Sequence, residues 1–488
     1  MEAGEVMLTA EKLRVFPYLE ELTLEQCKQL RSAPSHFPSL KKLVIREVES
    51  GMPIASILSN KLTTLTYLEV DGVKGLTSLP EGMLRNNKNL KCLKIGNCPE
   101  LSCIAPHGFD CCASLESLTI WECPKLRYLS DGLLSLSLKE LGIQNCSSLE
   151  SIPIIPEEGG LASLRTLWIF ECSLRNLPDG LQYCTSLRNL LIDSCPEITS
   201  IPIPSAGLPS LGQLVLMQCP ELSSLPSGLG CCTSLDDLTM IGCPKVTSIP
   251  IGSLSTTLRC LAVSNLESLP ILHGGFTSLR QLGIDGCQST QIDLQFCQIL
   301  VSLEDLRISD CPNLETVPSL DKLTSLRQLW IRDCSRLTCL PSGLAMASPH
   351  VFTRLESLSL GPFWNELDSF PALQVLPQLE SLTIYGWPKL KSLPEQIQHL
   401  TSLTELRIED FEGVEAIPEW LGNLASLHSL HIRSCKNLMY LPSVQAMQRL
   451  TKLDYLEMWN CPLLRERCTA ESGPEWPKIS HIPYISGI

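Results

Sequence analysis

Apolar residues recur at a fixed short spacing along almost the whole chain. In the segment TSLRNLLIDSCPEITSIP (Thr185–Pro202), Leu187, Leu190 and Ile192 follow the pattern L-x-x-L-x-L, and Cys195 comes three residues after the isoleucine. An apolar residue at every second position is typical of a short β-strand that buries one face. The segment therefore predicts a strand that ends just before a cysteine.

The same arrangement is an internal repeat, L-x-x-L-x-L-x-x-C-x-x-L-x-x-L-P. We count nineteen copies, whose first leucines run from Leu19 to Leu453. Their mean spacing is about 24 residues, which is typical of a stacked repeat array. Each unit returns the chain to the same side, so the strands should stack as a parallel sheet. The predicted fold is an α/β repeat solenoid with a concave parallel β-sheet and a convex face of turns and short 3₁₀ segments.

One position of the unit is usually cysteine, and it lies where the chain must bend out of the strand. Where cysteine is absent, the position holds Val48, Val73, Phe363, Trp387 or Phe411. Apolar replacement favours a packing role, with a weak S–H donor beside the turn. We therefore expect free thiols. The cysteine ladder consists of Cys27, Cys98, Cys123, Cys146, Cys172, Cys195, Cys219, Cys243, Cys287, Cys311, Cys334, Cys435 and Cys461.

The repeat divides the chain into three segments. We expect a lead-in at 1–18, a solenoid of about nineteen units at 19–464, and a C-terminal capping segment at 465–488. The sequence shows no capping segment before the first unit, so we expect further repeats or another module to stack on Leu19–Leu30. The residues expected to close the last strand are Trp476, Ile479, Ile482, Pro483, Tyr484 and Ile485.

The composition and charge of the chain disfavour a nucleic-acid-binding, an exported or a membrane-spanning protein. The chain has 488 residues, 44% hydrophobic and 5% aromatic, with a net charge of −14, which disfavours a general nucleic-acid footprint. The opening MEAGEVMLTAEKL has no export signal. The uncharged run Ile198–Pro220 contains four prolines, which disfavours a membrane helix. We expect a soluble, cytoplasmic protein with neither a membrane nor a nucleic acid as its partner.

Motifs for catalysis, metal binding or phosphate binding are missing from the sequence. The chain contains no C-x-x-C, HExxH, GxSxG or GxGxxG, and no Gly-Lys dipeptide for a Walker loop. We predict no catalytic, cofactor or metal residues, no cofactor, and a protein that is not an enzyme.

Two sets of residues between and beside the buried leucines should face the concave surface. The first set is apolar and aromatic, and such exposed surface usually marks an interface. A covering loop or domain, or ordinary scattered exposure, is the open alternative. Its members are Trp121, Trp168, Phe170, Leu191, Met217 and Ile241.

The second set is rich in arginine and aromatic residues, which are enriched at binding hot spots. Asp285, Asp310, Asp333 and Glu409 lie among them, so a self-satisfied ionic lattice and a site for an acidic or phosphorylated partner both stay open. The predicted partner-binding residues of this set are Arg307, Trp330, Arg332, Tyr385, Arg407, Arg433 and Trp459.

Three stretches resemble the leucine-rich-repeat domain of plant intracellular nucleotide-binding immune receptors of the coiled-coil type. They are FPYLEELTLEQCKQL (Phe16–Leu30), the linker LPSGLGCCTSL (Leu225–Leu235), and the ending CPLLRERCTAESGPEWPKISHIPYI (Cys461–Ile485). The resemblance implies a leucine-rich-repeat horseshoe that senses a pathogen effector or a guarded host protein and takes part in autoinhibition. Only about eighteen residues precede the first unit. The family's ATP/ADP switch therefore maps to no residue here, and its nucleotide-binding module becomes an expected partner.

Other classes of protein stay open. A substrate-recruiting subunit of a ubiquitin ligase also favours cysteine at this position, although its repeats do not usually end in L-P. An extracellular ectodomain would favour Asn in place of Cys, and the chain has only the sequon Asn145-Cys146-Ser147. A stand-alone leucine-rich-repeat scaffold is a further alternative.

Overall fold

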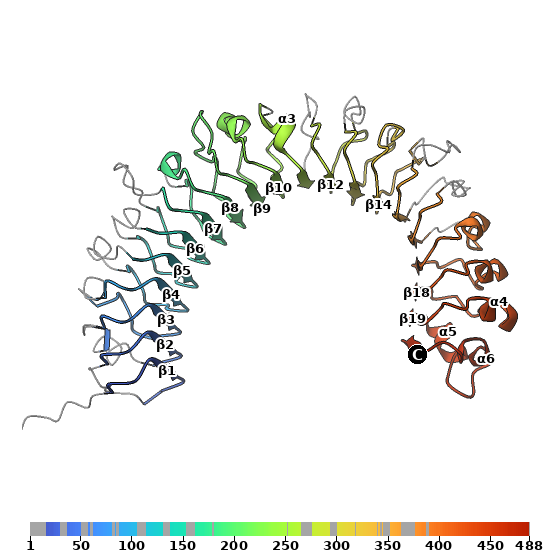
Figure 1. The fold of residues 1–488 in the computed structure, drawn as a ribbon, viewed down its shortest axis with the longest axis horizontal. Helices are drawn as coiled ribbons and strands as arrows, with labels where there is room; N and C mark the ends of the chain where they lie inside the picture. Colours follow the sequence, from blue (N-terminus) through green and yellow to red (C-terminus); the bar gives the residue numbers. More distant parts are fainter. Residues whose placement is uncertain are drawn as a thin grey trace, which may run out of the picture. The chain divides into compact units, whose positions relative to one another are not determined.

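The structure is a computed structural model in which the chain forms two compact units, Met1–Leu235 (unit 1) and Asp236–Ile488 (unit 2). Both units are parallel stacks of short strands, and in each the strands line the concave side while the connecting segments form the convex side (Figure 1). The residues that the structure describes are 16–29, 37–49, 57–58, 62–80, 83, 87–104, 114–129, 137–152, 162–177, 180–250, 252–264, 276–292, 300–317, 319–338, 340–341, 344, 352–362, 376–386 and 390–487.

Unit 1 has one five-residue strand per repeat, and neighbouring strands pair in parallel. Leu167 of one strand lies opposite Leu190 of the next, and Ile169 lies opposite Ile192. Leucine and isoleucine therefore stack along the unit. The strands are β1 (Glu21–Glu25), β2 (Lys42–Arg46), β3 (Tyr67–Asp71), β4 (Cys92–Gly96), β5 (Ser117–Trp121), β6 (Glu140–Gln144), β7 (Thr166–Phe170), β8 (Asn189–Asp193) and β9 (Gln213–Met217).

Unit 2 repeats the same construction. Its strands are β10 (Asp237–Ile241), β11 (Cys260–Ser264), β12 (Gln281–Asp285), β13 (Asp305–Ser309), β14 (Gln328–Arg332), β15 (Ser357–Gly361), β16 (Ser381–Tyr385), β17 (Glu405–Glu409), β18 (Ser429–Arg433), β19 (Tyr455–Trp459) and β20 (Tyr484–Ser486). The predicted parallel-stranded repeat solenoid is confirmed for each unit.

The core is a row of aliphatic side chains from the second and fourth positions of each strand. In β8 these are Leu190 and Ile192, both fully buried, and Leu187 just before the strand is buried as well. The third and fifth positions of the strands, which we call the outward positions, face the concave surface and are mostly half-buried. β1 is the exception in unit 1, since Leu22 and Leu24 are only half-buried.

A left-handed turn residue separates each strand from its cysteine. Asn97, with φ of 48°, donates its N–H to the carbonyl of Trp121 in the next strand at 3.0 Å. The thiol of Cys123 lies 3.4 Å from the same carbonyl oxygen and donates to it. One strand-end carbonyl thus accepts from the preceding turn and from its own cysteine, which explains the cysteine after each alternating segment. Val48, Val73 and Phe411 fill the position with buried apolar groups, whereas Phe363 and Trp387 lie outside the described residues.

Short elements occupy the convex side, as the repeat length predicts. In the described ranges the longest is six residues, because each unit leaves only about a dozen residues outside the strand and its turn. They are the 3₁₀ segments η3 (Leu181–Tyr183), η4 (Ser227–Cys231), η6 (Glu395–His399) and η7 (Glu419–Asn423), and the helical turns α3 (Leu254–Thr257) and α4 (Val444–Arg449).

The C-terminal segment folds over the end of unit 2. It contains α5 (Pro462–Arg467), α6 (Trp476–Ile479) and β20, which pairs in parallel with β19. Ile479 and Ile482 are buried, whereas Tyr484 is exposed. Of the residues expected to close the last strand, the two isoleucines supply the buried surface and the tyrosine does not.

Candidate functional site

The concave surface of unit 1 carries aromatic and apolar residues in continuous columns. The register aligns Gly142, Trp168, Leu191 and Val215 in one column of outward positions. Within this unit, the outward positions of neighbouring strands therefore lie side by side, as the repeat predicts.

The Trp168 side chain packs over a glycine of the neighbouring strand. A side chain on Gly142, its register partner in β6, would collide with the Trp168 indole ring, so the ring lies directly over the β6 backbone. The Phe170 ring lies 5.1 Å from the Trp168 ring and is tilted by 34°. Leu191 is the register partner of Trp168 on the other side. These three predicted residues form one half-buried surface, which we call the aromatic platform.

Trp121 forms a separate contact of the same kind. Its indole lies over Gly96 in β4, in the direction away from the aromatic platform. Gln144 occupies the register position between Trp121 and Phe170. Met217, half-buried at the end of β9, is likewise separated from Phe170 by Asp193. The predicted apolar set of unit 1 thus consists of a central cluster with two flanking residues.

A polar cluster on β2–β4 lies outside the residues predicted from the sequence. Arg46 Nη2 lies 2.6 Å from the carboxylate of Glu69, and the Tyr67 hydroxyl donates to the same carboxylate at 2.6 Å. Burial alone would raise the pKa of Glu69, but the hydrogen bonds from Tyr67 and Arg46 outweigh it and lower the pKa. Lys42 and Lys94 flank the Tyr67 ring at 5.6 and 5.9 Å from its centre.

The concave surface of unit 2 is an ionic lattice over β17–β19. Arg407 pairs with Glu405 at 2.7 Å, and Arg433 pairs with Glu457 at 2.8 Å. His431 lies between the two pairs, with Nδ1 at 2.6 Å from Glu457 and Nε2 at 3.3 Å from Glu405. Both ring nitrogens of His431 therefore face carboxylate oxygens, which joins the two ion pairs into one network.

The carboxylates of this lattice are mostly not those expected from the sequence. Of the expected acids, Glu409 contributes one long pair, 3.8 Å from Arg433. Asp310 and Asp333 are exposed turn residues with positive φ. The hydrogen bond from Arg433 is the main cause that lowers the pKa of Glu457, against a smaller opposing effect of burial.

Two further arginines of unit 2 contact aromatic rings. The Arg307 guanidinium lies 4.6 Å from the centre of the Trp330 ring and pairs with Asp305 at 2.8 Å. The Arg332 guanidinium lies 3.9 Å from the centre of the Tyr385 ring. The structure therefore brings the predicted arginines and aromatic residues of β13–β16 into contact.

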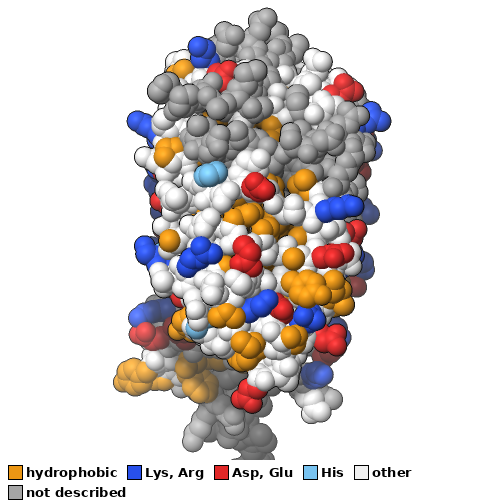
Figure 2. Space-filling view, turned by 90° about the vertical axis from the view of Figure 1, so that its right-hand side faces the viewer, with side chains coloured by type: hydrophobic (Ala, Val, Ile, Leu, Met, Phe, Trp, Pro, Cys, Tyr) orange, Lys and Arg blue, Asp and Glu red, His pale blue; other side chains and the backbone are white. Residues whose placement is uncertain are grey.

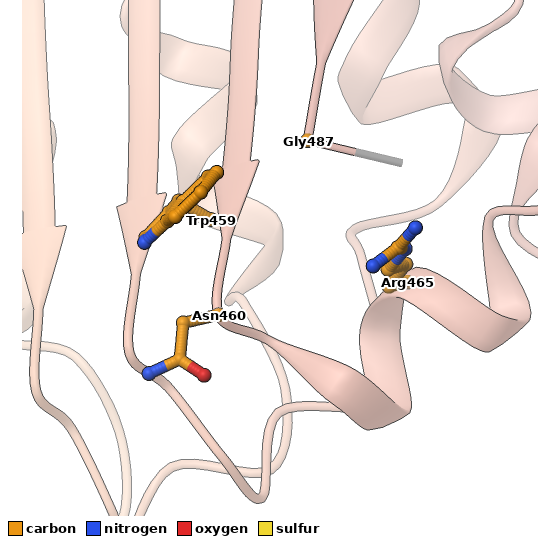
Figure 3. Close-up of a pocket in the computed structure, with 4 residues that line it drawn as sticks. All are labelled: Trp459, Asn460, Arg465 and Gly487. Atoms are coloured by element: carbon orange, nitrogen blue, oxygen red, sulfur yellow. The ribbon is translucent and has the colours of Figure 1, made fainter.

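The remaining predicted residues lie apart from these clusters. Trp459 ends β19 and is 64% exposed. It borders an open hollow of about 540 Å³ that is also lined by Asn460, Arg465 and Gly487 (Figure 3). Ile241 is half-buried at the end of β10, with Ser264 as its register partner.

One side of the molecule carries side chains of mixed charge and polarity. Figure 2 shows the side that lies on the right of Figure 1, where basic and acidic side chains are interspersed with apolar ones. Within the described ranges, no three His, Cys, Asp or Glu side chains are grouped so as to hold a metal ion. The helices of the described part are all too short or too polar to cross a membrane. Burial raises the pKa of the Cys146 thiol to about 11, so this cysteine is a poor nucleophile at neutral pH.

Comparison with known proteins finds similarity over part of the chain. A family model described as R13L1/DRL21 LRRs, that is, leucine-rich repeats, matches residues 274–334 and 389–461. A probable disease resistance protein of Arabidopsis thaliana is 29% identical over 145 residues, which cover 27% of this chain. The matched stretches are leucine-rich repeats similar to those of plant disease-resistance proteins. The aligned stretch of this domain corresponds to 16% of the length of the Arabidopsis relative.

Solved structures similar to this leucine-rich-repeat domain come from bacteria as well as plants. YopM from Yersinia enterocolitica has a TM-score of 0.49 and 21% identity, with 90% of this chain and 91% of YopM covered. A leucine-rich-repeat protein of Leptospira interrogans has a TM-score of 0.48 and 18% identity, with coverages of 86% and 90%. The plant receptor RGFR1, solved in complex with RGF2, has a TM-score of 0.39 and 18% identity, with coverages of 92% and 84%.

Proposed function

We propose that this domain is a non-enzymatic protein-recognition module, which senses a pathogen effector or a guarded host protein inside the plant cell. The kinship with plant disease-resistance proteins supports an immune role. In such a receptor the same domain would also hold the protein inactive until the ligand binds.

The observation that carries this proposal is the aromatic platform of unit 1. Trp168, Phe170 and Leu191 form a half-exposed apolar surface on a face that is open to solvent. Contiguous apolar surface of this kind usually marks an interface, and tryptophan is among the residues most often found at hot spots.

Site-specific photo-crosslinking in plant cells tests the proposal. A photoreactive phenylalanine analogue is placed at Phe170 on the concave side or, as a control, at the exposed Tyr183 in η3 on the convex side. We expect the ligand to crosslink from position 170 and not from position 183, and we expect Trp168→Ala to reduce that crosslink at least tenfold. Crosslinking that is equal from both positions, or unchanged by Trp168→Ala, would contradict the proposal.

A further inference from the structure

Arg332 differs from the other arginines predicted to bind a partner. Arg307, Arg407 and Arg433 are each paired with a carboxylate at 2.7 to 2.8 Å. The Arg332 side chain makes no hydrogen bond or ion pair with any residue that the structure describes, and its Nε is buried without a partner. A guanidinium offers five N–H donors, and at the end of β14 those of Arg332 have no acceptor among the described residues.

Arg332 is nevertheless held in place. Its register partner is Gly361 in β15, which has no side chain to obstruct the path across that strand. The guanidinium reaches over this strand to the Tyr385 ring in β16, at 3.9 Å from the ring centre. Tyr385 is only 9% exposed, so the ring is a fixed support. Stacking on a buried ring orients a guanidinium and leaves its edge available for hydrogen bonds.

A second unpaired donor lies on the same strand as Arg332. Trp330 occupies the outward position two residues before Arg332, on the same face of β14. Its indole Nε1 is buried and has no hydrogen-bond partner among the described residues. Buried polar groups are nearly always paired in folded proteins, so two unpaired donors on one strand are a departure that calls for an acceptor.

We propose that Arg332 binds the carboxylate of an acidic side chain on the protein ligand, as a site distinct from the aromatic platform. A planar carboxylate matches the fork of one guanidinium with two parallel hydrogen bonds. Asp310 and Asp333 lie in the turns that follow β13 and β14. The negative charges of Asp310 and Asp333 repel a doubly charged phosphate more strongly than a singly charged carboxylate. The inference rests on the proposed recognition function and specifies one chemical feature of the ligand.

The side-chain ¹⁵N–¹H resonances of arginine in the full chain provide a test that does not need the natural ligand. The Arg332 Nε–Hε signal is assigned as the one that disappears in Arg332→Lys. The protein is then titrated with the α-amide of N-acetylglutamate, and in parallel with the α-amide of N-acetylglutamine, with N-acetylalanine and with inorganic phosphate. Arg307, which already has its own carboxylate, serves as the internal control.

We expect the glutamate derivative to shift the Arg332 signal in a saturable way, with a smaller shift at Arg307 and none from the neutral glutamine derivative. No shift, or equal shifts at Arg332 and Arg307, would overturn the site. A response to N-acetylalanine or phosphate at an equal or lower concentration would overturn its assignment to an acidic side chain. Crosslinking at Phe170 is independent of this titration, so a failed Arg332 site and a failed recognition function give different results.

Discussion

At the scale of single residues, Trp168 and Gly142 act as one unit. The indole covers the glycine backbone. One part of its apolar area is buried against β6 and contributes to stability, and the other part is available to a ligand. The repeat pattern predicts an outward tryptophan but not its contact. The space for the ring comes from a glycine on the neighbouring strand, more than twenty residues earlier in the chain.

Gly142→Ala should therefore weaken ligand binding without removing any ligand-contacting group. The added methyl group collides with the Trp168 ring and forces it off β6. We expect at least a tenfold loss of binding and a destabilisation of about 1 kcal/mol, measured by urea unfolding. Gly283→Ala, where the added methyl group makes only ordinary contacts, is the control and should change neither quantity. Unchanged binding in Gly142→Ala would argue against the platform as the binding surface.

The lattice around His431 predicts a dependence of stability on pH. The pKa of Glu457 is lowered in the folded protein, so the unfolded chain takes up a proton first as the pH falls. Its stabilisation is present above the unfolded pKa, near 4.3, and is lost as the pH falls through the lower folded value. We expect Glu457→Gln to cost about 1–3 kcal/mol at pH 6 and much less at pH 3, in urea unfolding at each pH. A cost that does not change with pH would show that the charge of Glu457 is irrelevant.

At the scale of elements, strand and turn could be predicted from the sequence because each repeat encodes them in the same way. The buried pair in each strand and the cysteine after it depend only on the path of the backbone. The ionic lattice depends on positions that the repeat leaves free. Asp305 and Glu405 lie two residues before Arg307 and Arg407 in D-L-R and E-L-R, which places each pair on one face of one strand. The sequence signal for these two ion pairs is an acid and an arginine that lie two residues apart on one strand.

The cysteine position and the strand core should respond differently to substitution. Cys195→Val keeps an apolar group in a position where Val48 and Val73 occur naturally, so we expect a cost below about 1.5 kcal/mol. Leu190→Ala opens a cavity beneath β8 and should cost about 2–5 kcal/mol. Urea unfolding of both variants compares them directly. A larger cost for Cys195→Val would mean that the thiol hydrogen bond, rather than packing, maintains the turn.

A buried carboxylate connects the C-terminal segment to the repeat before it. Glu475 is 3% exposed and accepts hydrogen bonds from the Leu441 N–H at 2.8 Å and from Lys478 at 2.6 Å. Glu475→Ala leaves the Leu441 N–H without its acceptor and Lys478 with only the Leu441 carbonyl, so we expect a destabilisation of about 3 kcal/mol, seen in urea unfolding. Glu466→Ala, at an exposed position of α5, should be nearly neutral. Equal effects of the two substitutions would remove the capping role proposed for 465–488.

At the scale of the whole molecule, stability should vary along each unit. Leu22 and Leu24 in β1 are half-buried, whereas Leu190 and Ile192 in β8 are fully buried. Amide hydrogen exchange should therefore be much faster in β1 than in β8, because local opening follows the loss of buried apolar contacts. Equal protection of both strands in a monodisperse sample would show that β1 is covered as well as an interior strand.

The outward side chains do not determine the path of the backbone, and this affects how the concave surface can evolve. Hydrogen bonds and buried leucines hold each strand in register, so most outward positions can mutate one at a time without disturbing their neighbours. The glycines beneath Trp121 and Trp168 are exceptions, because any larger residue there displaces the ring. Substitutions at Gly142 and Trp168 should thus be inherited together, and related genes that have lost the tryptophan should be the ones free to replace the glycine.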